Sequence, residues 1–160
     1  MYDEEDEEYF IFAGRGIQLE PLAFDKFAEL KDFDFLEVEK CGSFNYNDYS
    51  SASPDGLVSD NSILEIKCPR REKFFKIISK GTEIVDKNYI YQMQFQMMCT
   101  QREKAYFFNY YLDRGFEMWH ELEFYPDNKI MKLIDERLLM FYEKREDYIN
   151  QIKQNMQFAF

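Results

Sequence analysis

The chain has 160 residues, a formal net charge of −11 and 46% hydrophobic residues. This length and composition suit one folded domain with a sizeable core, and they exclude an intrinsically disordered chain. No apolar run is long enough to cross a membrane, and the acidic N-terminus lacks the basic start of a signal peptide, so we expect a cytoplasmic protein.

The N-terminal part of the chain is predicted to be an acidic tail followed by a helix. Asp3 through Glu8 contribute six negative charges. We expect residues 1–12 to be a disordered, solubilising tail and residues 13–160 to form a single domain. A helix is predicted from about Ile17 to Lys31, where apolar residues recur at helical spacing. Glu20 lies beside that apolar face, in a position to point inward at the edge of a sheet.

Short strands are predicted after this helix. Phe35–Glu39 alternates like a strand, and residues 41–50, rich in Gly, Ser, Asn and Tyr, are expected to form a loop or a hairpin. Gly56–Val58 has the pattern of a strand end, and Ile63–Lys67 is apolar enough for a buried strand. Residues 59–62 supply the turn between these two strands.

Three polar residues lie on either side of this turn, namely Asp55, Glu65 and Lys67. Strand side chains alternate between the two faces of a sheet, so Glu65 and Lys67 project to the same side. Placing an acid and a lysine in one hydrophobic strand costs the free energy of removing their charges from water, and a charged partner or a metal ion offsets this cost.

The length of the turn decides whether Asp55 shares that face. A two-residue loop would put Asp55 and Glu65 on opposite faces. A three-residue loop over residues 60–62 pairs Leu57 with Glu65 and brings Asp55 to the same face. We predict the odd-numbered loop or an equivalent bulge, because Asn61 tolerates the left-handed conformation that such a loop needs.

Two carboxylates and a lysine in this arrangement suit metal-dependent hydrolysis of a phosphodiester. Mg²⁺ takes oxygen ligands, commonly one or two carboxylates together with waters and substrate phosphate. Asp55 and Glu65 would supply the carboxylates, and the carbonyl group of Ile66 a third oxygen. A bound metal lowers the pKa of a water, and Lys67 would orient that water or offset charge on the phosphorane. The plain alternative is a buried Glu–Lys pair on an ordinary hairpin.

Basic residues follow the strand, with only Glu72 opposing them: Arg70, Arg71, Lys73, Lys76 and Lys80. Because they come directly after the proposed metal site, we predict that the first four contact the phosphate backbone of DNA, despite the negative net charge. The alternative is a solvated loop and helix face. The acidic tail would either solubilise the protein or mimic DNA and compete for this basic surface.

Two helices are predicted next. Lys73–Lys80 suggests a short helix ended by Gly81, and Asn88–Thr100 a Gln- and Met-rich helix. Gln92 and Gln96 are four residues apart and share one helix face. Gln92 is in a position to hydrogen-bond a metal-bound water or a substrate phosphate, although both amides would equally suit backbone capping or solvent exposure.

Two strands and a long helix complete the chain. Lys104–Tyr111 and Glu117–Phe124 are predicted to be strands joined by a turn around Gly115. A helix follows from Asp127 to about Gln154, and we expect its apolar stripe to pack in the core.

Several of these motifs resemble, in order and spacing, those of the phage lambda-type exonucleases, also called the YqaJ-like viral recombinase family, in the PD-(D/E)xK nuclease superfamily. The match centres on residues 53–69, where Pro54-Asp55 and Glu65-x-Lys67-Cys68-Pro69 are present. Residues 16–20 resemble the first-helix motif of the family, residues 91–97 the later helix that brings a glutamine to the active site, and residues 105–110 the strand that follows. The resemblance covers roughly residues 13–150.

The resemblance implies an α/β (α+β) fold with a PD-(D/E)xK restriction-endonuclease-like core, a mixed sheet flanked by helices. It implies one or two Mg²⁺ or Mn²⁺ ions held by Asp55, Glu65, the Ile66 carbonyl group and Glu20. The catalytic residues would be Asp55, Glu65, Lys67 and Gln92, and Arg15 joins the predicted DNA-binding residues. Cys41, Cys68 and Cys99 are expected to be reduced thiols, and we expect no iron–sulfur cluster because three cysteines cannot supply four ligands.

The implied activity is 5′–3′ exonucleolysis at the ends of double-stranded DNA in phage- or viral-type recombination, in the host cytoplasm if the gene is viral. The implied partners are a single-strand annealing protein and further copies of the chain in a trimer, without a membrane. Family members usually carry a longer N-terminal region that helps to bind the 5′-terminal phosphate. A structure-specific or nicking endonuclease of the same fold therefore remains an alternative, as does a non-catalytic DNA- or protein-binding module.

Overall fold

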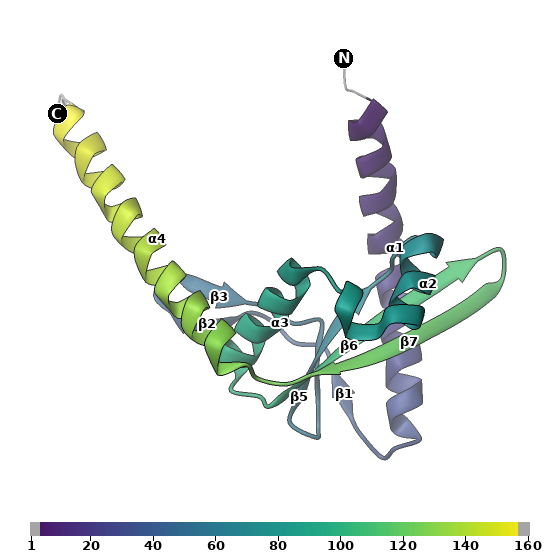
Figure 1. Ribbon diagram of the computed structural model, residues 1–160. Helices are drawn as coiled ribbons and strands as arrows, with labels where there is room; N and C mark the ends of the chain where they lie inside the picture. Colours follow the sequence, from purple (N-terminus) through teal and green to yellow (C-terminus); the bar gives the residue numbers. More distant parts are fainter. Residues whose placement is uncertain (1–3, 157–160) are drawn as a thin grey trace.

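The computed structural model describes the backbone of residues 4–156 and the side chains of residues 16–156. A five-stranded mixed sheet lies at its centre, in the order β1-β4-β5-β6-β7, and a separate two-stranded hairpin lies beside it (Figure 1). Within the five-stranded sheet β5 and β6 are parallel and the other neighbours are antiparallel. The predicted mixed sheet flanked by helices is confirmed.

The elements in chain order are α1 (Glu4–Asp32), β1 (Val38–Glu39), β2 (Phe44–Asn47), β3 (Ser50–Ala52), β4 (Gly56–Val58), β5 (Ser62–Lys67), α2 (Arg71–Lys80), the 3-10 helix η1 (Gly81–Ile84), α3 (Lys87–Thr100), β6 (Lys104–Asp113), β7 (Phe116–Phe124) and α4 (Asn128–Asn155).

Helix α1 is longer than the sequence pattern predicted. It begins at Glu4 and not near Ile17, so residues 4–12, expected to be a disordered tail, are helical. Glutamate has a good helix propensity, and negative charge in the first turns of a helix is stabilised by the helix dipole. The acidic run therefore favours the helix that it was expected to precede. Residues 1–3 of the expected tail lie outside the described residues.

The two faces of the sheet carry two separate hydrophobic cores because strand side chains alternate. The core under α1 contains Phe27, whose ring meets those of Tyr106 and Phe108 edge-on at centroid distances of 5.5 and 5.1 Å. The core on the opposite face contains Ile63 of β5 and Met93 of α3, both fully buried. Helix α1 thus packs on one face of the sheet and α3 on the other.

Truncation of the α1 core is expected to destabilise the fold strongly. Phe27→Ala should lower the free energy of unfolding by about 3–5 kcal/mol, since it removes a fully buried ring and leaves a cavity. Urea denaturation followed by circular dichroism measures the change. The matched variant Phe35→Ala, at a side chain that is 94% exposed, should change stability by less than about 0.5 kcal/mol. Equal losses in the two variants would contradict this packing.

The strand predicted at Phe35–Glu39 is shorter in the structure. Only Val38–Glu39 pairs as β1, because residues 33–35 form a turn in which Phe35 has a φ of 59°. The hairpin expected within residues 41–50 is present as β2 and the start of β3. The three cysteines form no disulfide among the described residues.

The C-terminal helix α4 differs most from its predicted role. We expected its apolar stripe in the core, but no residue of α4 is buried, and the helix projects away from the sheet (Figure 1). Its start is held in place, since Asp127 Oδ1 accepts hydrogen bonds from the backbone N–H groups of Lys129 and Ile130. Within residues 4–156 no helix is both long and apolar enough to span a membrane.

Candidate active site

The turn between β4 and β5 sets the face on which the candidate catalytic residues lie. Leu57 pairs with Ile63 and Val58 with Ser62, so the loop is the three-residue segment 59–61. The predicted odd-numbered loop is confirmed, and Asn61 is in the left-handed conformation with a φ of 68°. The predicted pairing of Leu57 with Glu65 is wrong by two residues. An even shift preserves the face, so Asp55 still lies on the same side as Glu65 and Lys67.

Side chains from distant parts of the chain hold this turn in place. Arg102 donates hydrogen bonds from Nη1 to the carbonyl oxygens of Val58 and Ser62, at 2.6 and 2.9 Å. Asp60 Oδ2 lies 2.8 Å from Lys104 Nζ and accepts a hydrogen bond from the Tyr106 hydroxyl group at 2.7 Å. The observed position of the turn therefore depends on contacts with the start of β6 as well as on local sequence.

Asp55 is held against the backbone of β5. Its N–H group donates to the Leu64 carbonyl oxygen at 2.9 Å, and its Oδ2 accepts from the Ile66 N–H group at 2.6 Å. Burial raises the pKa of Asp55 to about 7, and the nearby charge of Glu65 acts in the same direction, against the opposing effects of the Ile66 N–H group and Lys67. A carboxyl group with this pKa binds a cation well once it has lost its proton.

Glu65 is 1% exposed and has both carboxylate oxygens engaged. Oε1 forms an ion pair with Lys67, and Oε2 accepts a hydrogen bond of 2.7 Å from Gln96 Nε2. Burial alone would lower the pKa of Lys67, but the charge of Glu65 and its hydrogen bond raise it overall. The Lys67 ammonium group also lies 4.7 Å from the centroid of the Tyr89 ring. The site thus contains a charged Glu–Lys pair whose surroundings fix its geometry.

Glu20 approaches the same site from α1. It lines a hollow of about 250 Å³ together with Asp55 and Ile66, and its charge contributes to the raised pKa of Asp55. The other lining residues are Pro21, Phe24, Lys40, Cys41, Ser53 and Pro54. The structure therefore brings Glu20, Asp55 and Ile66 around one opening, and their role as metal ligands stays a prediction.

The donor atoms around this hollow have the chemistry of a Mg²⁺ or Mn²⁺ site. Glu20, Asp55 and Ile66 line the hollow, and their carboxylate and carbonyl oxygens are hard donors, whereas the buried Glu65 lies beneath the lining close enough for its charge to act on Asp55. Among the side chains of residues 16–156, no three His, Cys, Asp or Glu groups are close enough together to enclose a metal. Mg²⁺ needs no such cluster, because it commonly binds through one or two carboxylates and keeps waters and substrate phosphate as its other ligands.

The glutamine that reaches the site is Gln96 and not Gln92. Gln92 is exposed, whereas Gln96 is 1% exposed and donates to both Glu65 and the carbonyl oxygen of Ser53. Gln96 follows Met93 by three residues and so belongs to the buried stripe of α3. That spacing was the signal available in the sequence, and matching the glutamine to the family motif at position 92 missed it.

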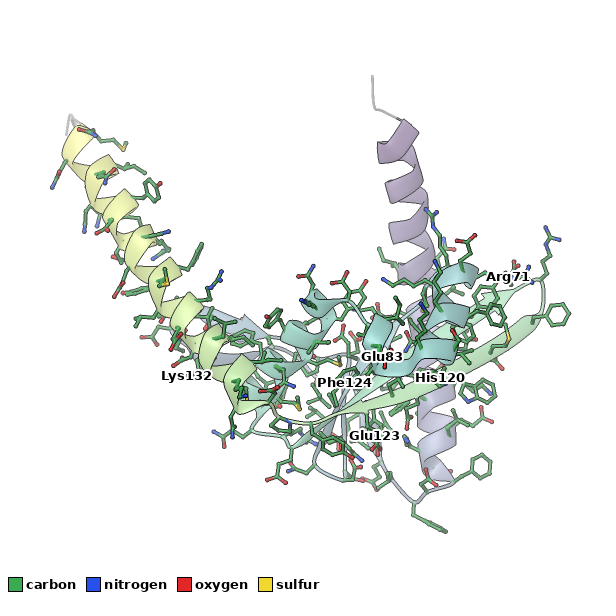
Figure 2. The ribbon with its side chains drawn as sticks, in the orientation of Figure 1. Arg71, Glu83, His120, Glu123, Phe124 and Lys132 are labelled. Atoms are coloured by element: carbon green, nitrogen blue, oxygen red, sulfur yellow. The ribbon has the colours of Figure 1, made fainter. Side chains whose placement is uncertain are left out.

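The predicted DNA-binding residues lie at the start of α2, directly after β5. Arg70, Arg71, Lys73 and Lys76 are all exposed and line one shallow hollow. Arg71 is visible at the beginning of α2 in Figure 2. Lys73 Nζ lies 5.0 Å from the Tyr89 centroid, so it shares that ring with Lys67. The side chain of Arg15 lies outside the described residues.

Comparison with known proteins gives consistent matches. Residues 2–103 match the family model of the YqaJ-like viral recombinase domain. The structure is similar to that of an alkaline exonuclease (LHK-Exo) from Laribacter hongkongensis, with a TM-score of 0.77 and 29% identity over 89% of this chain and 72% of the other. The structure of the same enzyme in complex with dAMP gives a TM-score of 0.79 and 28% identity, over 90% of this chain and 73% of the other.

A phage related exonuclease from Haemophilus somnus 129PT shares the fold, with a TM-score of 0.72 and 16% identity over 88% of this chain and 73% of that one. No curated protein matches the sequence. The PD-(D/E)xK fold expected from the sequence is confirmed by the similarity to these exonucleases.

Proposed function

This chain belongs to the family of YqaJ-like viral recombinase domains, and we propose that it is a metal-dependent exonuclease acting on the ends of double-stranded DNA. The single observation that carries the proposal is the grouping of Asp55, Glu65 and Lys67 at the end of β5. Two carboxylates and an ammonium group at one strand end can bind a cation and a phosphate together. The similarity to alkaline exonucleases supports the same reaction class.

In the proposed mechanism Asp55, Glu65 and the Ile66 carbonyl group would hold Mg²⁺ or Mn²⁺, with Glu20 as a further ligand. The ion would lower the pKa of a water and offset negative charge on the phosphate. The Ile66 N–H group fixes Asp55, and Gln96 fixes Glu65. Lys67 would orient the attacking water and donate to the non-bridging oxygens of the phosphate.

The basic residues beside the site would bind the DNA backbone. Lys73 lies with Lys67 over Tyr89, and Arg70, Arg71 and Lys76 continue the positive surface along α2. We propose 5′–3′ polarity and a role in recombination, with a single-strand annealing protein and other copies of the chain as partners, from the family resemblance. End-labelled duplexes with the label on either 5′ or 3′ ends test the polarity.

The decisive experiment compares linear and circular duplex DNA with and without Mg²⁺. The exonuclease proposal expects degradation of linear DNA only, dependent on Mg²⁺ and abolished by EDTA. Cleavage of covalently closed circles would instead indicate an endonuclease of the same fold. Inactivity on every substrate would contradict the proposal and favour a binding module.

Metal binding is expected to strengthen as the pH rises through about 7, the pKa of Asp55 in the metal-free protein. Below that pH a metal ion must displace the Asp55 proton, and above it the carboxylate is already free to bind. Calorimetric titration with Mn²⁺ in two buffers of different ionisation enthalpy measures proton release. More release is expected at about pH 6 than at about pH 8.

The control for this titration is Asp55→Asn, which keeps the shape of the side chain and removes its proton equilibrium. It should bind Mn²⁺ more weakly and lose the pH-dependent proton release. An affinity that does not change with pH in the wild-type protein would contradict the role assigned to Asp55.

A further inference from the structure

The β6–β7 hairpin extends well past the end of β5 (Figure 1). β5 ends at Lys67, which pairs with Asn109, whereas β6 continues to Asp113 before the chain turns. Arg114 in the turn comes five residues after Asn109. At the usual rise of a strand, the tip of the hairpin therefore lies about 16 Å beyond the level of Lys67.

The tip of this hairpin and α2 border a hollow of about 320 Å³. Two exposed aromatic side chains line it, Phe75 on α2 and Phe116 on β7, with exposed fractions of 43% and 73%, besides the buried ring of Tyr111. Two guanidinium groups, those of Arg71 and Arg114, lie in the same lining. The remaining lining residues are Asp113 and Met118.

This hollow is continuous with the basic surface beside the candidate active site. Arg71 lines both the hollow at the hairpin tip and the one formed with Arg70, Lys73 and Lys76. A chain of phosphates lying along α2 would therefore meet basic side chains as far as the hairpin tip, with Glu72 and Asp113 as the acidic residues of the two linings. That continuity makes a nucleic-acid strand the occupant that the charges favour.

The mixture of rings and arginines favours unpaired bases over a duplex. Bases stack on exposed aromatic rings, and arginines bind the adjoining phosphates, in proteins that hold single strands. In a duplex the faces of the bases are covered by their neighbours, so Phe75 and Phe116 would gain little from it. The carboxylate of Asp113 would repel a phosphate inside the hollow, so a base is the more favourable occupant there.

We propose that the β6–β7 tip and the start of α2 form a binding site for single-stranded DNA, namely the strand that remains when the other strand is digested. The source of this strand rests on the proposed exonuclease function, while the site itself rests on the contacts described. A separation of about 16 Å corresponds to about five nucleotides of stacked strand. The site would hold the remaining strand within a few nucleotides of the cleaved end.

Equilibrium binding of a fluorescent oligothymidylate of roughly 12 nucleotides, in EDTA to prevent hydrolysis, tests this site. Phe116→Ser is expected to weaken binding by about tenfold, which is the loss of one stacked base. Arg114→Asn suits the backbone, since Arg114 has a φ of 48°. It should weaken binding severalfold and reduce the slope of log affinity against log salt by about 1.

The matched control is Phe33→Ser, which removes an equally exposed ring, at 77%, from the turn after α1. It should bind the oligonucleotide like the wild-type protein. Unchanged binding in Phe116→Ser and Arg114→Asn, or an equal loss in Phe33→Ser, would overturn the proposal. A changed molecular mass of Phe116→Ser in sedimentation would overturn it as well, because the tip would then be a contact between copies of the chain.

Hydrolysis of linear duplex by the wild-type protein is measured separately, so the two proposals can fail independently. Weakened oligonucleotide binding in the variants of a protein without nuclease activity would support the site and count against the exonuclease function. Unchanged binding in the variants of an active nuclease would overturn the site alone.

Discussion

Lys67→Met is expected to reduce the rate of DNA hydrolysis by about 100- to 1,000-fold, the usual cost of losing one preorganised charged donor in an active site. Methionine retains most of the aliphatic stem beside Tyr89 but has no ammonium group to donate to the water or phosphate. The substitution also leaves Glu65, which is 1% exposed, with Gln96 as its remaining hydrogen-bond donor. We therefore expect a less stable metal-free protein whose stability Mg²⁺ restores.

Initial rates on an end-labelled linear duplex, with thermal unfolding in EDTA and in Mg²⁺, measure both effects. Lys132→Met is the matched control, since Lys132 is 79% exposed on α4 (Figure 2), a helix that contributes no residue to the candidate active site. It should retain wild-type activity and stability. A Lys67→Met variant that hydrolyses DNA at the wild-type rate would defeat the proposed mechanism.

It was possible to predict from the sequence that Asp55, Glu65 and Lys67 lie on one face of the sheet, because a hairpin of this length has few possible backbone arrangements. Strand alternation places Glu65 and Lys67 together, and only an odd-numbered loop adds Asp55. Asn61 provides the left-handed residue for that loop. The face depends only on whether the number of loop residues is odd or even, so moving the three-residue turn by one residue, which shifts the pairing by two, leaves it unchanged.

The exact position of the turn was not predictable from the same segment. Segments 59–61 and 60–62 both contain Asn61 and both place the acids on one face. The choice between them is associated with contacts from Arg102, Lys104 and Tyr106, about 40 residues later in the chain. A local pattern carries no information on such tertiary contacts.

For the long helices α1 and α4, the sequence pattern did not predict the extent of the helix or its surroundings. Periodic apolar residues in α4 correctly predicted a helix but not its environment, because the same spacing suits a core helix and one that projects from the domain. At the N-terminus, high negative charge predicts disorder, although glutamates at the start of a helix also stabilise it. Periodicity thus predicts the type of element more reliably than its extent or its partners, and negative charge alone does not separate a helix start from a disordered tail.

Two of the three glutamines of α3, Gln92 and Gln96, provide the sharpest test of the structure against the sequence pattern. Gln96→Leu is expected to lower metal affinity and hydrolysis by about 10- to 100-fold, the usual effect of removing a group that orients a metal ligand. The change removes the 2.7 Å hydrogen bond to Glu65 and the bond to the Ser53 carbonyl oxygen. Leucine is similar in size, so the core beside Met93 should stay filled.

Gln92→Leu is the control, with the same substitution on the same helix at an exposed position. It should leave Mn²⁺ affinity and the rate of hydrolysis unchanged, because Gln92 does not reach the carboxylates. If Gln92→Leu proved to be the damaging substitution, the glutamine assigned from the family motif would be correct and α3 would have to turn on its axis when DNA or metal binds. If Gln96→Leu alone is damaging, the amide acts through Glu65, and Gln96→Glu should fail more severely because it brings a second acid against that buried carboxylate.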